Sequence, residues 1–101
     1  MIVRLSRGSF DPVNYDAIRK RLDESQRTLA PAIRGLHGCL HYWAAIDAVA
    51  HTMVNISVWR SIDDARQMDS LAPMQALAAE FTALGVMFER PIVNYDTLWE
   101  I

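Results

Sequence analysis

Six side chains of types that can bind a ligand or take part in its chemistry fall at alternate positions of two neighbouring strand-like segments. They are Cys39, His41, Trp43, Asn55, Ser57 and Trp59. Alternate residues of a strand share one face, and a hairpin centred near Val49 would set Cys39 opposite Trp59, His41 opposite Ser57 and Trp43 opposite Asn55. The other face would then be almost pure hydrocarbon, formed by Leu40, Tyr42, Ala44, Val54, Ile56 and Val58. An imidazole, an amide, a hydroxyl, a thiol and two indoles on a rigid sheet favour a pocket for a flat organic ligand.

The same residues also have a structural interpretation, which stays open at this point. Indoles commonly fill a core or an interface, and His41 and Asn55 can hydrogen-bond each other or the backbone. Cys39 and His41 could form a nucleophilic pair, but no carboxylate or oxyanion-hole motif accompanies them. His37 lies roughly 13 Å from His41 along an extended chain, and His51 falls in the hairpin turn, so no metal site is expected.

The elements that must position these side chains follow from residue periodicity. An alternating strand covers residues 2–7. An amphipathic helix starts after the turn at 10–14, and because of Pro31 its regular part should end near residues 28–30, with a looser turn up to Leu36. A hairpin follows over 39–46 and 52–59. A second helix begins at a capping sequence, Ser61-Ile62-Asp63-Asp64, is kinked or split by Pro73 and stops at Gly85. The last strand spans 92–99.

This order predicts one α+β domain over residues 1–101, with a ferredoxin-like β-α-β-β-α-β fold and a four-stranded antiparallel sheet. Right-handed crossovers place both helices on one face of that sheet. The strands are apolar on both sides, as shown by Val3 and Leu5 alternating with Ile2 and by Tyr95 alternating with Leu98. We therefore expect a homodimer in which a second sheet covers the bare face, forming a dimeric α/β barrel.

Composition excludes several classes of protein. The net charge is −2 and the basic residues are scattered, so no nucleic-acid partner is expected. Cys39 is the only cysteine, which excludes an internal disulfide and a zinc site built on several thiolates. No apolar stretch approaches the roughly 20 residues that a membrane helix needs, and the first residues do not resemble a signal peptide. We expect a cytoplasmic protein with no membrane partner.

A strand that ends in Trp and is followed by a capped helix, Val58-Trp59-Arg60-Ser61-Ile62-Asp63-Asp64-Ala65, resembles the antibiotic biosynthesis monooxygenase domain family. Gly38 before the second strand and the order of elements agree with that family over nearly the whole chain. The resemblance implies a homodimeric α/β barrel with a pocket between sheet and helices in each subunit. It also implies oxidation of polyphenols to quinones by O₂, with no metal or flavin cofactor.

In those relatives an Asn and a Trp four residues later assist the chemistry, and Asn55 and Trp59 match that spacing. The resemblance implies that Asn55 hydrogen-bonds a phenolate or carbonyl oxygen and that Trp59 packs against the ring. The family's helix tyrosine is replaced near Ala65. The Trp and His of the haem-degrading branch fall near Met68 and Ala78, so haem is not expected.

The resulting hypothesis is a cofactor-independent monooxygenase that acts on a small aromatic or quinone-like compound. Asn55, Trp59 and His41 are its candidate catalytic residues, and Trp43, Ser57 and Cys39 are its candidate substrate-binding residues. Two alternatives stay open. One is a non-catalytic module that binds a small molecule, and the other is a purely structural dimer.

Overall fold

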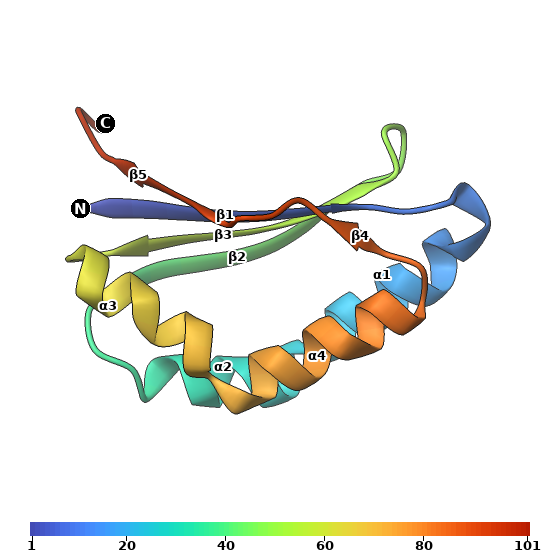
Figure 1. The fold of residues 1–101 in the computed structure, drawn as a ribbon, viewed down its shortest axis with the longest axis horizontal. Coiled ribbons are helices and arrows are strands. Elements are labelled where there is room, and N and C mark those ends of the chain that lie inside the picture. The colour runs from blue at the N-terminus through green and yellow to red at the C-terminus, as the bar shows by residue number, and fades with distance from the viewer.

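The computed structural model describes all 101 residues and shows an antiparallel sheet with every helix on one side of it (Figure 1). The strands are β1 (Ile2–Ser9), β2 (Cys39–Asp47), β3 (Thr52–Trp59), β4 (Met87–Phe88) and β5 (Val93–Asp96). The helices are α1 (Tyr15–Glu24), α2 (Gln26–Arg34), α3 (Ile62–Arg66) and α4 (Ala72–Ala83), with 3-10 turns η1 (Pro12–Asn14) and η2 (Gln67–Ser70). The strand order is β2-β3-β1-β4, and β5 also pairs with β1. The predicted ferredoxin-like α+β architecture is confirmed.

The hairpin of β2 and β3 is confirmed, but its predicted register is wrong beyond the first pair. Cys39 pairs with Trp59 as predicted, whereas a bulge between Cys39 and His41 sets His41 opposite Val58 and Trp43 opposite Ile56. A bulge adds one residue to one strand, so every later side chain of β2 changes face. His41 and Trp43 therefore do not share a face with the polar residues of β3.

Gly38 leads directly into this irregular start of β2. Its φ of 73° lies in the left-handed region, which glycine adopts without a steric penalty. A Cβ at this position would lie 2.0 Å from Oδ2 of Asp64. Gly38 therefore lets the start of β2 approach α3 closely, and its carbonyl accepts a hydrogen bond from the Arg60 amide at 2.9 Å.

The first predicted helix is broken at Ser25, not near Pro31. Ser25 is buried and its hydroxyl donates to the carbonyl of Leu22 at 2.5 Å, a competition with backbone hydrogen bonding that bends helices. Pro31 lies inside α2, which continues to Arg34. The break separates α1 from α2 without ending the helical path along the sheet (Figure 1).

The second half of the chain follows the predicted plan with one addition. The Ser61 hydroxyl caps α3 by accepting from the Asp64 amide at 3.1 Å, and the helical segment is interrupted before α4, where Pro73 occupies the first turn. The last strand, predicted over residues 92–99, is shorter in the structure and forms β5. The unpredicted β4 precedes it, and Pro91, which has no amide to donate to a ladder, lies between the two. Both pieces pair with β1, so they act as one interrupted edge strand.

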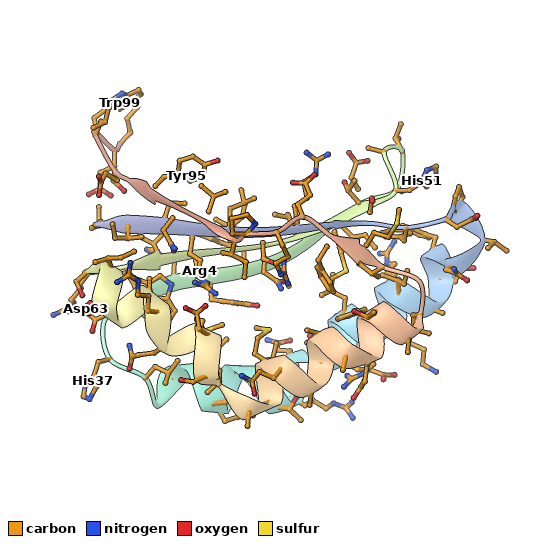
Figure 2. The ribbon with its side chains drawn as sticks, viewed as in Figure 1. Arg4, His37, His51, Asp63, Tyr95 and Trp99 are labelled. Carbon is orange, nitrogen blue, oxygen red and sulfur yellow. The ribbon has the colours of Figure 1, made fainter.

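The core lies between the sheet and the helices. Trp59, Phe81, Ile18 and Met53 are its largest fully buried side chains. On the opposite face of the sheet, Figure 2 shows Tyr95 and Trp99 pointing away from the helices, while Arg4 points toward them. No helix has both the length and the apolar character that a membrane crossing requires.

Candidate functional site

An inner cavity of about 60 Å³ lies between the sheet and the helical layer. Its polar lining comes from three adjacent strands and the loop after β4, and comprises Arg4, Ser6, Tyr42, Asn55, Ser57 and Arg90. Its apolar lining comprises Met53, Met68, Met74, Leu77, Ala78, Phe81, Phe88 and Ile92. The polar groups meet because cross-strand pairing sets Arg4 opposite Ser57 and Ser57 opposite Tyr42. Of the six predicted site residues, the structure brings two into this cavity, Asn55 and Ser57.

Two polar atoms in this cavity have no hydrogen-bond partner in the protein. They are the Tyr42 hydroxyl and the Asn55 Oδ1, and both atoms are fully buried. A buried polar atom without a partner costs roughly 1–3 kcal/mol, so such atoms are normally satisfied by a ligand or by water. Since both atoms belong to residues of one cavity wall, they mark the position where a bound molecule can supply the missing hydrogen bonds.

Tyr42 is held in its neutral form. Burial raises the pKa of its phenol well above the usual range, and the neighbouring Cys39 raises it further, while Arg4 acts in the opposite direction. A neutral phenol donates a hydrogen bond and does not serve as a general base at neutral pH. Tyr42 is therefore suited to donate to a carbonyl or phenolate oxygen.

Trp59 does not line the cavity but contacts Ser57, which does. Its side chain has no solvent exposure, and its indole N–H donates to the Ser57 hydroxyl at 2.8 Å. This hydrogen bond fixes the hydroxyl that faces the cavity. Trp59 lines neither this cavity nor the outer groove, so its predicted contact with a substrate ring stays a prediction.

Two arginines lie at the side of the cavity formed by β1 and the β4–β5 loop. Arg4 is buried and its guanidinium pairs with Asp69 of η2 at 2.7 Å. Arg90 donates to the Ser6 hydroxyl at 3.3 Å, and its guanidinium lies 4.7 Å from the ring centroid of Phe88. No carboxylate lines the cavity.

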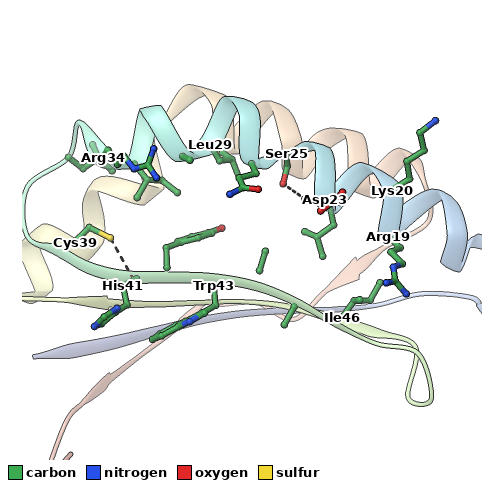
Figure 3. Close-up of a pocket in the computed structure, with 18 of the residues that line it drawn as sticks. Arg19, Lys20, Asp23, Ser25, Leu29, Arg34, Cys39, His41, Trp43 and Ile46 are labelled. Atoms are coloured by element: carbon green, nitrogen blue, oxygen red, sulfur yellow. Dashed lines mark hydrogen bonds between the residues drawn. The ribbon is translucent and has the colours of Figure 1, made fainter.

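An outer groove of about 1,200 Å³ lies between α1, α2 and the edge strand β2 (Figure 3). Its walls combine apolar side chains, such as Leu29 and Ile33 of α2, with charged ones, such as Arg19 and Asp23 of α1. Tyr42 lines both the groove and the inner cavity. The tyrosine side chain thus lies between the large outer groove and the small inner cavity.

His41 and Trp43 lie on the other side of β2. Figure 3 shows their rings on the face opposite the helices, with the Cys39 sulfur on the helix side. The two rings stack at 5.2 Å with an interplanar angle of 15°, and Trp43 is 49% exposed. The bulge therefore removes both rings from the cavity that Asn55 and Ser57 line, contrary to the predicted single face.

Cys39 lines the outer groove and packs against the core. Burial raises the pKa of its thiol, which lowers the share of the nucleophilic thiolate at neutral pH. Its Sγ donates to the carbonyl of His41 at 3.7 Å and not to the imidazole. The structure does not place Cys39 and His41 as a nucleophile and its base.

Sequence reasoning missed four polar residues of the cavity, Tyr42, Arg4, Ser6 and Arg90. Arg4 and Ser6 were detectable, because they alternate with Val3 and Leu5 on a strand whose Ile2 is buried. Tyr42 was assigned to the wrong face because of the bulge. Arg90 gave no signal, because it lies in the irregular segment between β4 and β5.

No family model and no curated protein sequence matches the chain. Solved structures do match. A Deinococcus radiodurans protein named as a candidate antibiotic biosynthesis monooxygenase has a TM-score of 0.76 and 18% identity, over 100% of this chain and 96% of that chain. The monooxygenase from the gene ActVA-Orf6 of Streptomyces coelicolor, solved with nanaomycin D, has a TM-score of 0.73 and 20% identity, over 99% and 89%.

A third match is SnoaB from Streptomyces nogalater, a cofactor-independent oxygenase. Its TM-score is 0.65 and its identity 14%, over 99% of this chain and 95% of that chain. Each alignment spans nearly all of both chains, so the similarity covers the complete set of elements and not a shared fragment. The chain therefore has the fold of the antibiotic biosynthesis monooxygenases.

Proposed function

We propose that this protein is a cofactor-independent monooxygenase that oxidises a small phenolic or quinone-like compound, with the reacting oxygen bound by Asn55 and Tyr42. The observation that carries the proposal is the pair of buried, unpartnered polar atoms of these two residues in one cavity. The names of the matched structures support the same reaction class.

The cavity offers the hydrogen bonds that such a reaction requires. The Asn55 amide can accept from a phenol or donate to a phenolate, and the neutral Tyr42 can donate to the same oxygen. Donors that favour the anion increase the share of the electron-rich form of the substrate. That anion passes electrons to O₂, and a ring CH₂ group with one O₂ becomes a carbonyl group and one water, so no external reductant is needed.

The ring system needs more room than the inner cavity has. Typical small-molecule sites measure roughly 300–1,000 Å³, whereas the inner cavity holds about 60 Å³ and the groove beyond Tyr42 about 1,200 Å³. Met53, Met68 and Met74 line the inner cavity, and methionine side chains adapt readily to a ligand. We infer that a turn of Tyr42 joins the two spaces and that the ring enters from the groove.

Oxygen consumption tests the proposed reaction. The protein incubated with a panel of naphthols and anthrones should consume O₂ in proportion to quinone formed, and no product should form under anaerobic conditions. Asn55→Ala should lower turnover about 10²- to 10³-fold, as removal of one such hydrogen-bonding group does in other enzymes. Failure of every substrate to raise O₂ uptake above the rate without protein would contradict the proposal.

Asn94→Ala is the matched control for Asn55→Ala. The Asn94 Oδ1 is also buried without a partner, but Asn94 lines neither the cavity nor the groove. Its replacement should leave turnover unchanged. Equal losses in the two variants would mean that Asn55 acts through general packing and not through the substrate.

A binding function without turnover is a second candidate. It is favoured by the absence of any carboxylate or histidine among the cavity-lining residues, since these are the common general bases at neutral pH. Saturable binding of a naphthol, seen as a rise in melting temperature, with no O₂ uptake would support this candidate.

We further propose that two copies of the chain pack through the open face of the sheet. This face carries Val3, Leu5, Val54, Ile56 and Val58 together with the exposed side chains of Trp43, Val93 and Tyr95. The C-terminal tail, residues 97–101, also projects on this side (Figure 2), and its Leu98, Trp99 and Ile101 are exposed. Because the apolar tail and the apolar face lie on the same side, the tail of each copy can pack against the open face of the other copy in a dimer.

Light scattering tests the homodimer. The protein should have the mass of two 101-residue chains. A variant that ends at Thr97 should dimerise more weakly because it lacks the apolar C-terminal tail. A monodisperse monomer at micromolar concentration would contradict the homodimer while leaving the proposed reaction to its own test. The cytoplasmic location stays a prediction from the sequence.

A further inference from the structure

One of the two cations that line the inner cavity has no acidic partner in the chain. Arg4 and Arg90 are the only charged residues that line it. Asp69 pairs with Arg4, whereas no Asp or Glu of the chain forms an ion pair with Arg90. Arg90 is exposed as a whole residue, so it stays charged in contact with water, and an unpaired guanidinium beside the cavity favours a negatively charged occupant.

The Arg90 guanidinium is held at the cavity by neutral groups only. Its Nη1 donates to the Ser6 hydroxyl at 3.3 Å and to the carbonyl of Glu89 at 2.9 Å, and the guanidinium rests on the Phe88 ring. Burial lowers the pKa of Arg90 from its usual value, and repulsion by Arg4 lowers it further.

The structure assigns Arg90, with Ser6, as the binding site for a carboxylate on an aromatic substrate. This assignment names a substrate class for the reaction proposed above and therefore rests on that proposal. The Arg90 fork matches the two oxygens of a carboxylate, and the Ser6 hydroxyl is free to donate while it accepts from Arg90. Such a ligand supplies the counter-charge that no Asp or Glu of the chain gives to Arg90.

The register of the sheet sets this carboxylate beside the reacting oxygen. Ser6 of β1 lies directly opposite Asn55 of β3, and side chains opposite one another across two strands stand about 5 Å apart. A carboxylate at Ser6 and Arg90 therefore places a neighbouring ring substituent at Asn55. Two strand spacings, about 10 Å, separate β1 from β2 and its Tyr42, so the rest of a two-ring compound extends toward the groove. The preferred substrate carries its carboxylate next to the phenol.

A matched pair of ligands tests the assignment under anaerobic conditions, where no turnover interferes. The probes are 1-hydroxy-2-naphthoate and its uncharged analogue 1-hydroxy-2-naphthamide, which have nearly the same shape. Titration calorimetry should show the carboxylate binding at least about tenfold more tightly than the amide, a difference of about 1.4 kcal/mol. A higher salt concentration should weaken binding of the carboxylate probe and leave binding of the amide probe unchanged.

Arg90→Gln should abolish this preference by weakening the carboxylate alone, and Arg90→Lys should retain part of it. The unchanged affinity for the amide shows that the variant is folded. Arg27→Gln is the control, because Arg27 is exposed on α2 and lines neither the cavity nor the groove; it should keep the full preference. Equal affinities for the two probes in the unmodified protein, binding of neither probe, or a preference that survives Arg90→Gln would each overturn the assignment.

The two proposals fail separately. If the carboxylate preference is present but no compound consumes O₂, the anion site stands and the monooxygenase reaction is wrong. If neutral naphthols are oxidised but the two probes bind equally, the reaction stands and the anion site is wrong.

Discussion

The two faces of the sheet are built from the same strands but differ in what covers them. The helix-covered face combines buried polar groups, such as Asn55 and Ser57, with a large apolar core around Trp59. The open face is apolar throughout its centre and carries the stacked rings of His41 and Trp43. The buried polar groups thus lie on the side that can enclose a small ligand, and the side without helices suits contact with another protein surface.

The difference between the faces depends on one irregularity in β2. Without the bulge before His41, the rings of His41 and Trp43 would join Asn55 and Ser57, and Tyr42 would face the open side. With the bulge, the inner cavity receives a phenol and loses an imidazole. The local backbone thus decides which chemistry the cavity contains, while the composition of the strands stays the same.

The largest expected effect concerns the core of the covered face. Trp59→Ala should lower the free energy of unfolding by about 3–5 kcal/mol, as large-to-small changes of buried aromatic residues do, because Trp59 is fully buried. Urea denaturation followed by circular dichroism measures the loss. Trp59→Phe should cost less, since it keeps most of the packing and removes only the hydrogen bond to Ser57. A loss below about 1 kcal/mol for Trp59→Ala would show that the wall behind the cavity is not essential to the fold.

The next effect concerns the open face and should leave the covered face unchanged. Trp43→Glu places a charge at the proposed contact between two copies and should raise the dimer dissociation constant about 100-fold, the range of an interface hot spot. Sedimentation equilibrium gives this constant. Trp43 is half-exposed in the single chain, so the variant should stay folded, and Trp43→Phe should remain dimeric. Loss of naphthol binding without loss of the dimer would reverse our assignment of the two faces.

Much of the fold was predictable because its signals are local. Alternation in β1 and β3, the Ser61 cap and the stop at Gly85 each depend on a few neighbouring residues, and the structure confirms them. The break at Ser25 was not predictable from the proline rule, because a buried hydroxyl competed for a helix carbonyl two turns before Pro31. The short strand β4 was also not predictable, because a segment of two residues has no periodic pattern.

The candidate site was predicted only in part, for a different reason. Asn55 and Ser57 lie on a regular strand, so their shared face followed from alternation alone. His41 and Trp43 follow the bulge, whose position depends on how β2 meets α3 at Gly38 and Asp64, a contact between distant parts of the chain. Arg90 reaches the cavity from an irregular loop through Ser6 and Phe88, which only the folded structure brings together.

A smaller effect distinguishes Tyr42 from its neighbour Trp43, because the two rings point to opposite faces. Tyr42→Phe removes a buried hydroxyl that has no partner in the protein, so the free energy of unfolding should stay the same or rise. Affinity for 1-hydroxy-2-naphthamide should fall by about 0.5–1.5 kcal/mol, the usual value of one hydrogen bond. Calorimetry and thermal unfolding measure the two quantities, with Trp43→Phe as the control that should alter neither. A Tyr42→Phe variant that is less stable and binds equally well would assign the hydroxyl to structure.

The smallest effect lies at the hairpin end, which serves neither face. The backbone amides of Ala50 and Val49 donate to the Asp47 carboxylate and lower its pKa. A carboxylate whose pKa is lower in the folded chain than in the unfolded chain stabilises the fold at pH values above its ordinary pKa of about 3.9. This contribution is lost as the pH falls through the pKa of the folded state. Asp47→Ala should therefore lower the melting temperature slightly at pH 7, and the gap from the unmodified protein should shrink toward pH 2. A gap of constant size down to pH 2 would mean that the carboxylate charge contributes nothing, and any change in dimer mass or ligand affinity would show that the turn is coupled to one of the faces.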